Sequence, residues 1–208
     1  DPQNVLKKYQ ETIPPAFLQN HNTCIPDHWN HTYQIVRKPA DLLNEMTQKL
    51  ETQFDKTINL GDLEEGLAEE MADRHIIAAF EAMHRHPQAK TLAAISGGEA
   101  STAIKGNGVG GPNREYVVHA ALKASPWLSS YKCTIMAIDT DGVDGSNDVA
   151  GALLDADYLH SQDLARKAKA ALEQSDSGSF LHEIGAQIVT GPTGTNLNDF
   201  RVIVLERR

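Results

Sequence analysis

The stretch Thr134-Ile135-Met136-Ala137-Ile138, followed by Asp139-Thr140-Asp141-Gly142-Val143-Asp144-Gly145, decides the fold class of this 208-residue chain. A short apolar run that ends in a polar, glycine-containing loop is typical of a buried strand. In open α/β sheets, ligands bind in the crevice outside the carboxyl ends of such strands. The stretch therefore predicts an α/β domain in which the loops after the strands carry the function.

Further apolar runs on both sides of this stretch predict more strands and helices. We expect strands at residues 33–36, 56–60, 91–95, 100–104, 187–189 and 202–205. Helical spacing predicts helices at residues 42–54, 116–122 and 164–172, and a long helix that ends before Pro87. Asp62 and Glu65, three residues apart, predict a capping box at the start of the long helix.

The alternation of strands and helices indicates a layered α/β/α domain with a largely parallel or mixed sheet. We expect this domain to span residues 32–208. Residues 1–31 contain four prolines and differ in composition from the rest, which favours a connector.

Composition and charge exclude several classes of function. The formal net charge of −9 repels phosphate backbones, which argues against nucleic-acid binding. No apolar run approaches the ~20 residues needed to cross a membrane. Cys24 and Cys133 lie far apart and form no CxxC pair, so we expect a reducing, cytoplasmic setting.

A glycine-rich stretch follows the strand expected at residues 100–104: Gly106-Asn107-Gly108-Val109-Gly110-Gly111-Pro112-Asn113-Arg114-Glu115. It suits an anion-binding loop at a helix N-terminus, with Lys105 and Arg114 as flanking positive charges. Its first glycines also match G-x-G-x-x-G, although Asp139 stands somewhat late for the acidic residue of a dinucleotide site. A tight turn without a ligand is the alternative.

Four aspartates crowd the loop after the 134–138 strand: Asp139, Asp141, Asp144 and Asp148. Carboxylates at the end of a buried strand suit Mg²⁺, which prefers oxygen ligands. A polar turn stabilised by its own side chains is the alternative.

A third motif, Thr190-Gly191-Pro192-Thr193-Gly194-Thr195-Asn196-Leu197-Asn198-Asp199, concentrates hydroxyl, amide and backbone N–H groups. Such a loop can hold the hydroxyl and carboxylate groups of a small acid, or a phosphate. It lacks the Gly-Lys-Ser/Thr of a Walker A loop. A surface loop rich in turn formers is the alternative.

Taken in order, these motifs resemble one family. Ser96-Gly97-Gly98-Glu99, Gly110-Gly111-Pro112-Asn113-Arg114-Glu115, Thr140-Asp141-Gly142-Val143-Asp144-Gly145, Asp148 with Ala150-Gly151, and the 190–199 motif are similar to the C-terminal half of class II glycerate kinases. This region, about residues 92–208, is called the MOFRL domain in the glycerate 2-kinase family. Residues 1–91 match more loosely.

The resemblance implies transfer of the ATP γ-phosphoryl group to the 2-hydroxyl of D-glycerate, with a divalent cation. It implies two α/β domains with the active site between them, so a small-molecule acid and the missing N-terminal domain are the expected partners. This sequence departs from the family pattern at Pro112, usually Arg, at Arg114, usually Gln, and at Asp139, usually a small uncharged residue.

The resemblance also suggests a role for each motif. Asp141 and Asp144 would hold Mg²⁺, and Lys105 and Arg114 would neutralise phosphate or carboxylate charge. Asp148 or Glu99 would assist the attacking hydroxyl, and the choice between them stays open. The expected contacts to substrate or nucleotide are Gly97, Gly98, Gly106, Gly108, Gly110, Gly111, Asn113, Thr190, Gly191, Thr193, Gly194, Thr195, Asn196 and Asn198.

Two other functions stay open. The G-x-G-x-x-G match allows an NAD(P)H-dependent hydroxypyruvate reductase, a name that some members of the family have carried. A non-catalytic domain that binds a small ligand is the other alternative, because this chain would present only half of a cleft. A homo-oligomer is also left open by the sequence.

Overall fold

The computed structural model describes residues 35–145 and 147–208, and Arg37–Arg208 form one compact unit. The connector expected at residues 1–31 lies outside the described residues. Of the strand expected at residues 33–36, only Ile35 and Val36 are described, and they have no regular structure. The domain boundary at residue 32 therefore stays a prediction.

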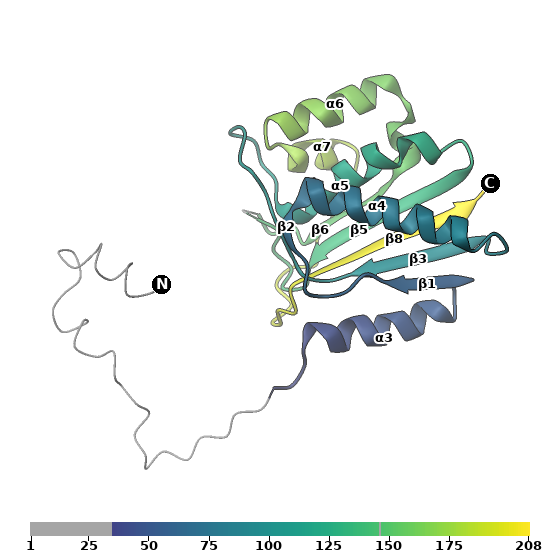
Figure 1. Ribbon diagram of the computed structural model, residues 1–208. Helices are drawn as coiled ribbons and strands as arrows, with labels where there is room; N and C mark the ends of the chain where they lie inside the picture. The colour runs from purple at the N-terminus through teal and green to yellow at the C-terminus, as the bar shows by residue number, and fades with distance from the viewer. Residues whose placement is uncertain (1–34, 146) are drawn as a thin grey trace, which may run out of the picture. The chain divides into compact units, whose positions relative to one another are not determined.

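A six-stranded sheet runs through the unit in the order β1-β3-β8-β5-β6-β7 (Figure 1). Its strands are β1 (Lys56–Asn59), β3 (Thr91–Ser96), β5 (Tyr131–Asp139), β6 (Gly151–Asp155), β7 (Gln187–Ile188) and β8 (Asp199–Arg207). β1 and β3 are parallel, whereas the other neighbouring pairs are antiparallel. The sheet is thus mixed, which is the second of the two expected forms.

Chain connections explain the mixed sheet. A parallel connection needs a crossover, and α5 (Pro112–Ala124) supplies one between β3 and β5. β8 then inserts between β3 and β5 and runs antiparallel to both. β5 and β6 are joined by a loop without a helix, so they are antiparallel as well.

Helices cover both faces of the sheet. α4 (Ala68–Arg85) and α5 pack on one face, and α3 (Pro39–Glu51) lies on the other (Figure 1). α6 (Gln162–Glu173) and α7 (Ser177–Glu183) contact α5. The predicted α/β class is therefore confirmed.

Side chains that alternate along a strand belong to two separate cores, one on each face of the sheet. On β3, Leu92 belongs to the large core beneath α4 and α5, while Ile95 packs with Leu43 of α3 and Phe200 of β8. This period of two follows from the pleat of a strand. α5 is buried on most sides, so polar side chains on its first turns must find partners inside the protein.

A second, small sheet pairs β2 (Glu65–Leu67) with β4 (Glu99–Ser101) in parallel. It shows that the capping box predicted at Asp62 and Glu65 was wrong. Residues 65–67 pair with β4, and α4 begins only at Ala68. Tertiary pairing has overridden the local helix signal, and the strand expected at residues 100–104 is shortened to Glu99–Ser101.

The expected helices at 42–54, 116–122 and 164–172 are confirmed within a few residues. Sequence patterns did not predict α7, β6 or the 3₁₀ turns Ser125–Trp127 and Ala156–His160. Within residues 35–145 and 147–208, none of the helices is long and apolar enough to cross a bilayer.

Candidate functional site

Three loops meet at one edge of the six-stranded sheet. Because β8 runs antiparallel to β3 and β5, its first residues lie beside their last: Ser96 pairs with Arg201, and Asp139 with Asp199. This brings together the Gly-Gly-Glu turn (residues 97–99), the aspartate loop (residues 139–148) and the threonine loop (residues 190–198). Motifs that are far apart in sequence are therefore neighbours, as the resemblance implied.

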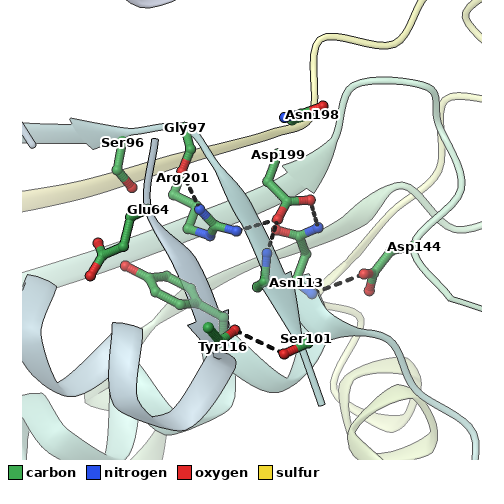
Figure 2. A network of polar contacts seen from close by, with 12 residues as sticks. Glu64, Ser96, Gly97, Ser101, Asn113, Tyr116, Asp144, Asn198, Asp199 and Arg201 are labelled. Atoms are coloured by element: carbon green, nitrogen blue, oxygen red, sulfur yellow. Dashed lines mark hydrogen bonds and ion pairs between the residues drawn. The ribbon is translucent and has the colours of Figure 1, made fainter. Parts of the chain in front are cut away.

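Arg201 and Asp199 hold the Gly-Gly-Glu turn from the sheet side (Figure 2). The Arg201 guanidinium donates from Nη1 to the carbonyl of Gly97 at 2.6 Å. Asp199 donates its backbone N–H to the carbonyl of Gly98 at 3.0 Å and accepts the N–H of Ala100 on Oδ2 at 2.7 Å. The backbone of the turn is thus fixed on this side.

Gly61 and Glu64 hold the same turn from the other side. The carbonyl of Gly61 accepts the N–H of Gly97 at 2.8 Å, and the carbonyl of Glu64 accepts the N–H of Glu99 at 3.0 Å. Gly98 has a φ of +83°, and a Cβ there would lie 2.0 Å from the Glu64 carbonyl oxygen. Only glycine fits this position, and the turn presents the Glu99 side chain to solvent.

Gly98→Ala is therefore expected to lower the free energy of unfolding by about 2–5 kcal/mol, from left-handed strain and the clash with Glu64 together. Gly185→Ala is the matched control, because Gly185 has a φ of +70° but no atom within 4 Å of the added Cβ. The control is expected to lose only about 1–2 kcal/mol. Urea unfolding of both variants tests this, and equal losses would contradict the clamped turn.

Asp199 is the centre of a buried polar network. Its carboxylate accepts the Asn113 side-chain amide at 2.6 Å and also accepts from the Arg201 guanidinium (Figure 2). Burial raises the pKa of Asp199, while Arg201, Asn113 and the Ala100 N–H act in the opposite direction. Asn113 therefore supports Asp199 from a buried position, and the ligand contact expected for it stays a prediction.

The network continues from Arg201 to the surface through Tyr116, His75 and Glu64. The Arg201 guanidinium lies over the Tyr116 ring, 5.3 Å from its centroid. The Tyr116 hydroxyl lies 2.9 Å from His75 Nδ1, and His75 Nε2 lies 2.5 Å from the Glu64 carboxylate. Burial lowers the pKa of His75, so a neutral ring that donates from Nε2 and accepts at Nδ1 fits both contacts.

Asp144 and Arg114 form a buried ion pair at the start of α5. Arg114 Nε lies 3.0 Å from Asp144 Oδ2, and the backbone N–H groups of Asn113 and Arg114 also donate to this carboxylate. Asp144 thus supplies the negative charge that a helix N-terminus favours. Both side chains are at most 1% exposed, so burial favours a structural role, and their expected roles as Mg²⁺ ligand and phosphate contact stay predictions.

The glycine loop (residues 106–111) packs against the segment between α6 and α7. The N–H of Gly108 donates to Gln174, and the N–H of Val109 donates to Asp176. A Cβ on Gly106 would lie 2.6 Å from the Gln174 carbonyl oxygen. Glycine is thus needed for close backbone packing, and these two N–H groups are not available to a phosphate.

The context of a dinucleotide fingerprint is also missing. The glycine loop follows β4, which belongs to the two-stranded sheet, and not a strand of the six-stranded sheet. A Rossmann fingerprint requires a loop that joins a strand of the main parallel sheet to its helix. The loop therefore offers no support for the reductase alternative.

The aspartate and threonine loops are held together as one unit. The Thr140 hydroxyl donates to the carbonyl of Asn198 at 2.8 Å and accepts the N–H of Leu197 at 2.7 Å. Thr193 donates its hydroxyl to the carbonyl of Thr140 at 2.6 Å and its N–H to the carbonyl of Asp141 at 3.0 Å. The threonine loop is thus positioned directly over the aspartate loop.

Asp139 and Asp141 form a pair of half-buried carboxylates in this unit. Burial raises the pKa of Asp139 to about 6, and the neighbouring charges of Asp141 and Asp199 add to the effect. No group of three or more His, Cys, Asp or Glu suited to a metal occurs among residues 35–145 and 147–208. Two carboxylates do not fill the coordination shell of Mg²⁺. The ion fits at this pair only if phosphate oxygens complete its coordination, as is usual for this ion.

The remaining expected contacts are distributed around this edge. Lys105 is exposed, and its Nζ lies 3.5 Å from the Glu69 carboxylate. The exposed residues are Glu99, Asp148, Thr190, Thr193, Gly194, Thr195 and Asn196, while Gly191 and Asn198 are half-buried and Gly97 and Gly98 are buried.

Sequence reasoning missed five members of the network. Arg201 had a signal, because a charged residue interrupts the apolar run of a buried strand. Asp199 closes the third motif but was given no role. Glu64, His75 and Tyr116 have no local signal, because the packing of α4 against α5 brings His75 to Tyr116, and Glu64 reaches His75 from the segment before β2.

Comparisons with known proteins agree with this arrangement. Residues 92–199 match the MOFRL family. The chain is 37% identical over 114 residues to a D-glycerate 2-kinase of Thermotoga maritima, covering 54% of this chain and 27% of that protein. It is 37% identical over 152 residues to a putative hydroxypyruvate reductase of Agrobacterium vitis, covering 70% of this chain and 34% of that protein.

The fold has a close counterpart among solved structures. The crystal structure of a glycerate kinase from Thermotoga maritima superposes with a TM-score of 0.74 and 27% identity, over 99% of this chain and 49% of that chain. The chain thus spans about half of the solved protein and a smaller share of the curated relatives. Because the family match covers all three loops of the site, this chain belongs to the MOFRL family.

Proposed function

We propose that the protein carrying this chain is a glycerate 2-kinase, which transfers the γ-phosphoryl group of ATP to the 2-hydroxyl of D-glycerate. The observation that carries the proposal is the meeting of the Gly-Gly-Glu turn, the aspartate loop and the threonine loop at one sheet edge. The names of the relatives and of the solved structure support the same activity.

We assign a role to each residue from its exposure and from the hydrogen bonds that fix its loop. Mg²⁺, bound through Asp141 and the phosphates of ATP, would neutralise charge on the transferred group. Lys105 supplies a positive charge at the border of the site. The hydroxyls and backbone groups of residues 190–198 orient the small acid.

Glu99 is the better candidate to accept the proton of the attacking hydroxyl. Hydrogen bonds from both sides fix the backbone of its turn, which fixes the point from which the carboxylate projects. Both Glu99 and Asp148 are exposed, and neither side chain accepts a hydrogen bond from another described residue, so the fixed turn is what favours Glu99. The glycerate oxygen then attacks the γ-phosphorus, the bond to the β–γ bridging oxygen breaks, and ADP leaves.

The chain presents one side of such a site. It spans a quarter to a third of the two curated relatives above, so we propose that another part of the whole protein completes the nucleotide and acid contacts. We also propose a cytoplasmic setting, which suits the free, buried thiol of Cys133.

Initial-rate assays of the intact protein test the proposal. Release of ADP from ATP that depends on D-glycerate and Mg²⁺ is the expected result. Oxidation of NAD(P)H with hydroxypyruvate, without ADP release, would replace the kinase with the reductase. Binding of either ligand without turnover by the intact protein would leave a non-catalytic domain.

A further inference from the structure

A pocket of about 330 Å³ lies between the glycine loop and the first turn of α5. Its volume falls in the range of small-ligand pockets, which are mostly apolar with a few polar groups. The apolar walls come from glycine backbone, from Pro112 and from Ile104, whose side chain is 84% exposed. Thr102, Ser175 and Glu115 add the polar groups.

Glu115 lines this pocket with a carboxylate that has no hydrogen-bond partner among the described residues. It is 6% exposed, and the nearest ionisable partner, His119 Nε2, lies 3.9 Å away, beyond hydrogen-bonding distance. Burial raises the pKa of Glu115, and although Lys105 opposes this, Glu69 and Asp144 add to it. A carboxylate normally accepts several hydrogen bonds, and because the protein supplies none here, donors can reach Glu115 only from the pocket, from solvent or from a ligand.

Anionic ligands fit poorly. Glu69 and Asp144 would repel the carboxylate of a small acid brought next to Glu115. A neutral group with two O–H donors avoids this penalty, because each oxygen of a carboxylate can accept one hydroxyl.

The size and the apolar walls of the pocket fit a ligand that is larger than a diol alone. Ile104 offers an exposed apolar surface at the pocket, of the kind on which a planar base packs. A nucleoside combines such a base with a vicinal diol. The opposite end of a nucleotide would then have to reach the aspartate loop, and Gly145 of that loop also lines the pocket.

We propose that this pocket binds the ribose of the nucleotide, with the Glu115 carboxylate accepting hydrogen bonds from its 2′- and 3′-hydroxyls. The inference rests on the proposed function, because it assigns one end of the same nucleotide. It gives a ligand contact to Glu115, to which the sequence motifs assign no role.

The test compares ATP with 2′-deoxy-ATP in calorimetric titrations of the intact protein. The unchanged protein is expected to bind ATP about tenfold more tightly, since a hydrogen bond to a charged acceptor is lost with 2′-deoxy-ATP. In Glu115→Gln the preference is expected to fall to about twofold or less, because the remaining acceptor is neutral. Glu70→Gln, an exposed change outside the pocket, should keep the full preference.

Each other outcome has a defined meaning. Equal binding of both nucleotides, with ADP release on D-glycerate intact, would overturn the ribose site and leave the proposed function standing. A Glu115→Gln variant with an unchanged ATP preference but weaker D-glycerate binding would move the diol contact to the acid and overturn the inference. Failure of both nucleotides to bind would overturn the inference and the kinase together. The comparison in the unchanged protein remains decisive even if the variant does not fold.

Discussion

Arg201→Met is expected to lower the free energy of unfolding by about 3–5 kcal/mol, because it leaves the Asp199 carboxylate buried without its cation. Asp199 and Arg201 are 5% and 1% exposed at their side chains, so water cannot replace the lost contact. The same change removes the donor to the Gly97 carbonyl and the cation over the Tyr116 ring. Urea unfolding followed by circular dichroism measures the loss.

Two controls separate the buried network from a general effect of losing an arginine. Arg166→Met removes a surface pair with Asp163, whose side chains are 80% and 57% exposed, and is expected to cost at most about 1 kcal/mol. Adding Asp199→Asn to Arg201→Met should recover part of the loss, because the unpaired charge disappears. A loss below about 1 kcal/mol in Arg201→Met would contradict the network.

Asp141→Ala in the intact protein is expected to lower kcat for ADP release by about 10²–10³-fold, the usual effect of losing one transition-state charge contact. The variant should also need a higher Mg²⁺ concentration, because the ion loses a carboxylate ligand. Steady-state kinetics over a Mg²⁺ series measure both effects. Val143 loses only one backbone hydrogen bond to this side chain, so the fold should persist.

Asp163→Ala is the matched control, since Asp163 lies exposed on α6 and pairs with Arg166 at the surface. It should leave kcat and the Mg²⁺ requirement unchanged. Unchanged kinetics in Asp141→Ala would remove Asp141 from the metal role and leave the aspartate loop a structural turn.

The sequence predicted the class of fold because its strands and helices carry strong local patterns. The 134–138 run became β5, and the apolar face ending before Pro87 became α4. Strand direction was harder to predict, because the position of β8 between β3 and β5 depends on tertiary packing. For the same reason residues 65–67 form a strand, where local signals favoured a helix start.

For the candidate site, the sequence located the loops better than it assigned roles within them. The order of the motifs predicted that Glu99, Asp141 and the threonine loop belong to one site, and they lie at one edge of the sheet. It could not separate Asp144 from Asp141, because only burial shows that Asp144 caps α5 beside Arg114. It also could not find Tyr116 and His75, whose spacing in the sequence gives no sign of their contact.

The most direct measurement is ³¹P NMR of the product formed by the intact protein from ATP, Mg²⁺ and D-glycerate. The account predicts a phosphomonoester on the 2-hydroxyl, together with ADP, and its loss in Asp141→Ala. Phosphorylation at the 3-hydroxyl, or no phosphorylated acid from an intact and folded protein, would contradict it.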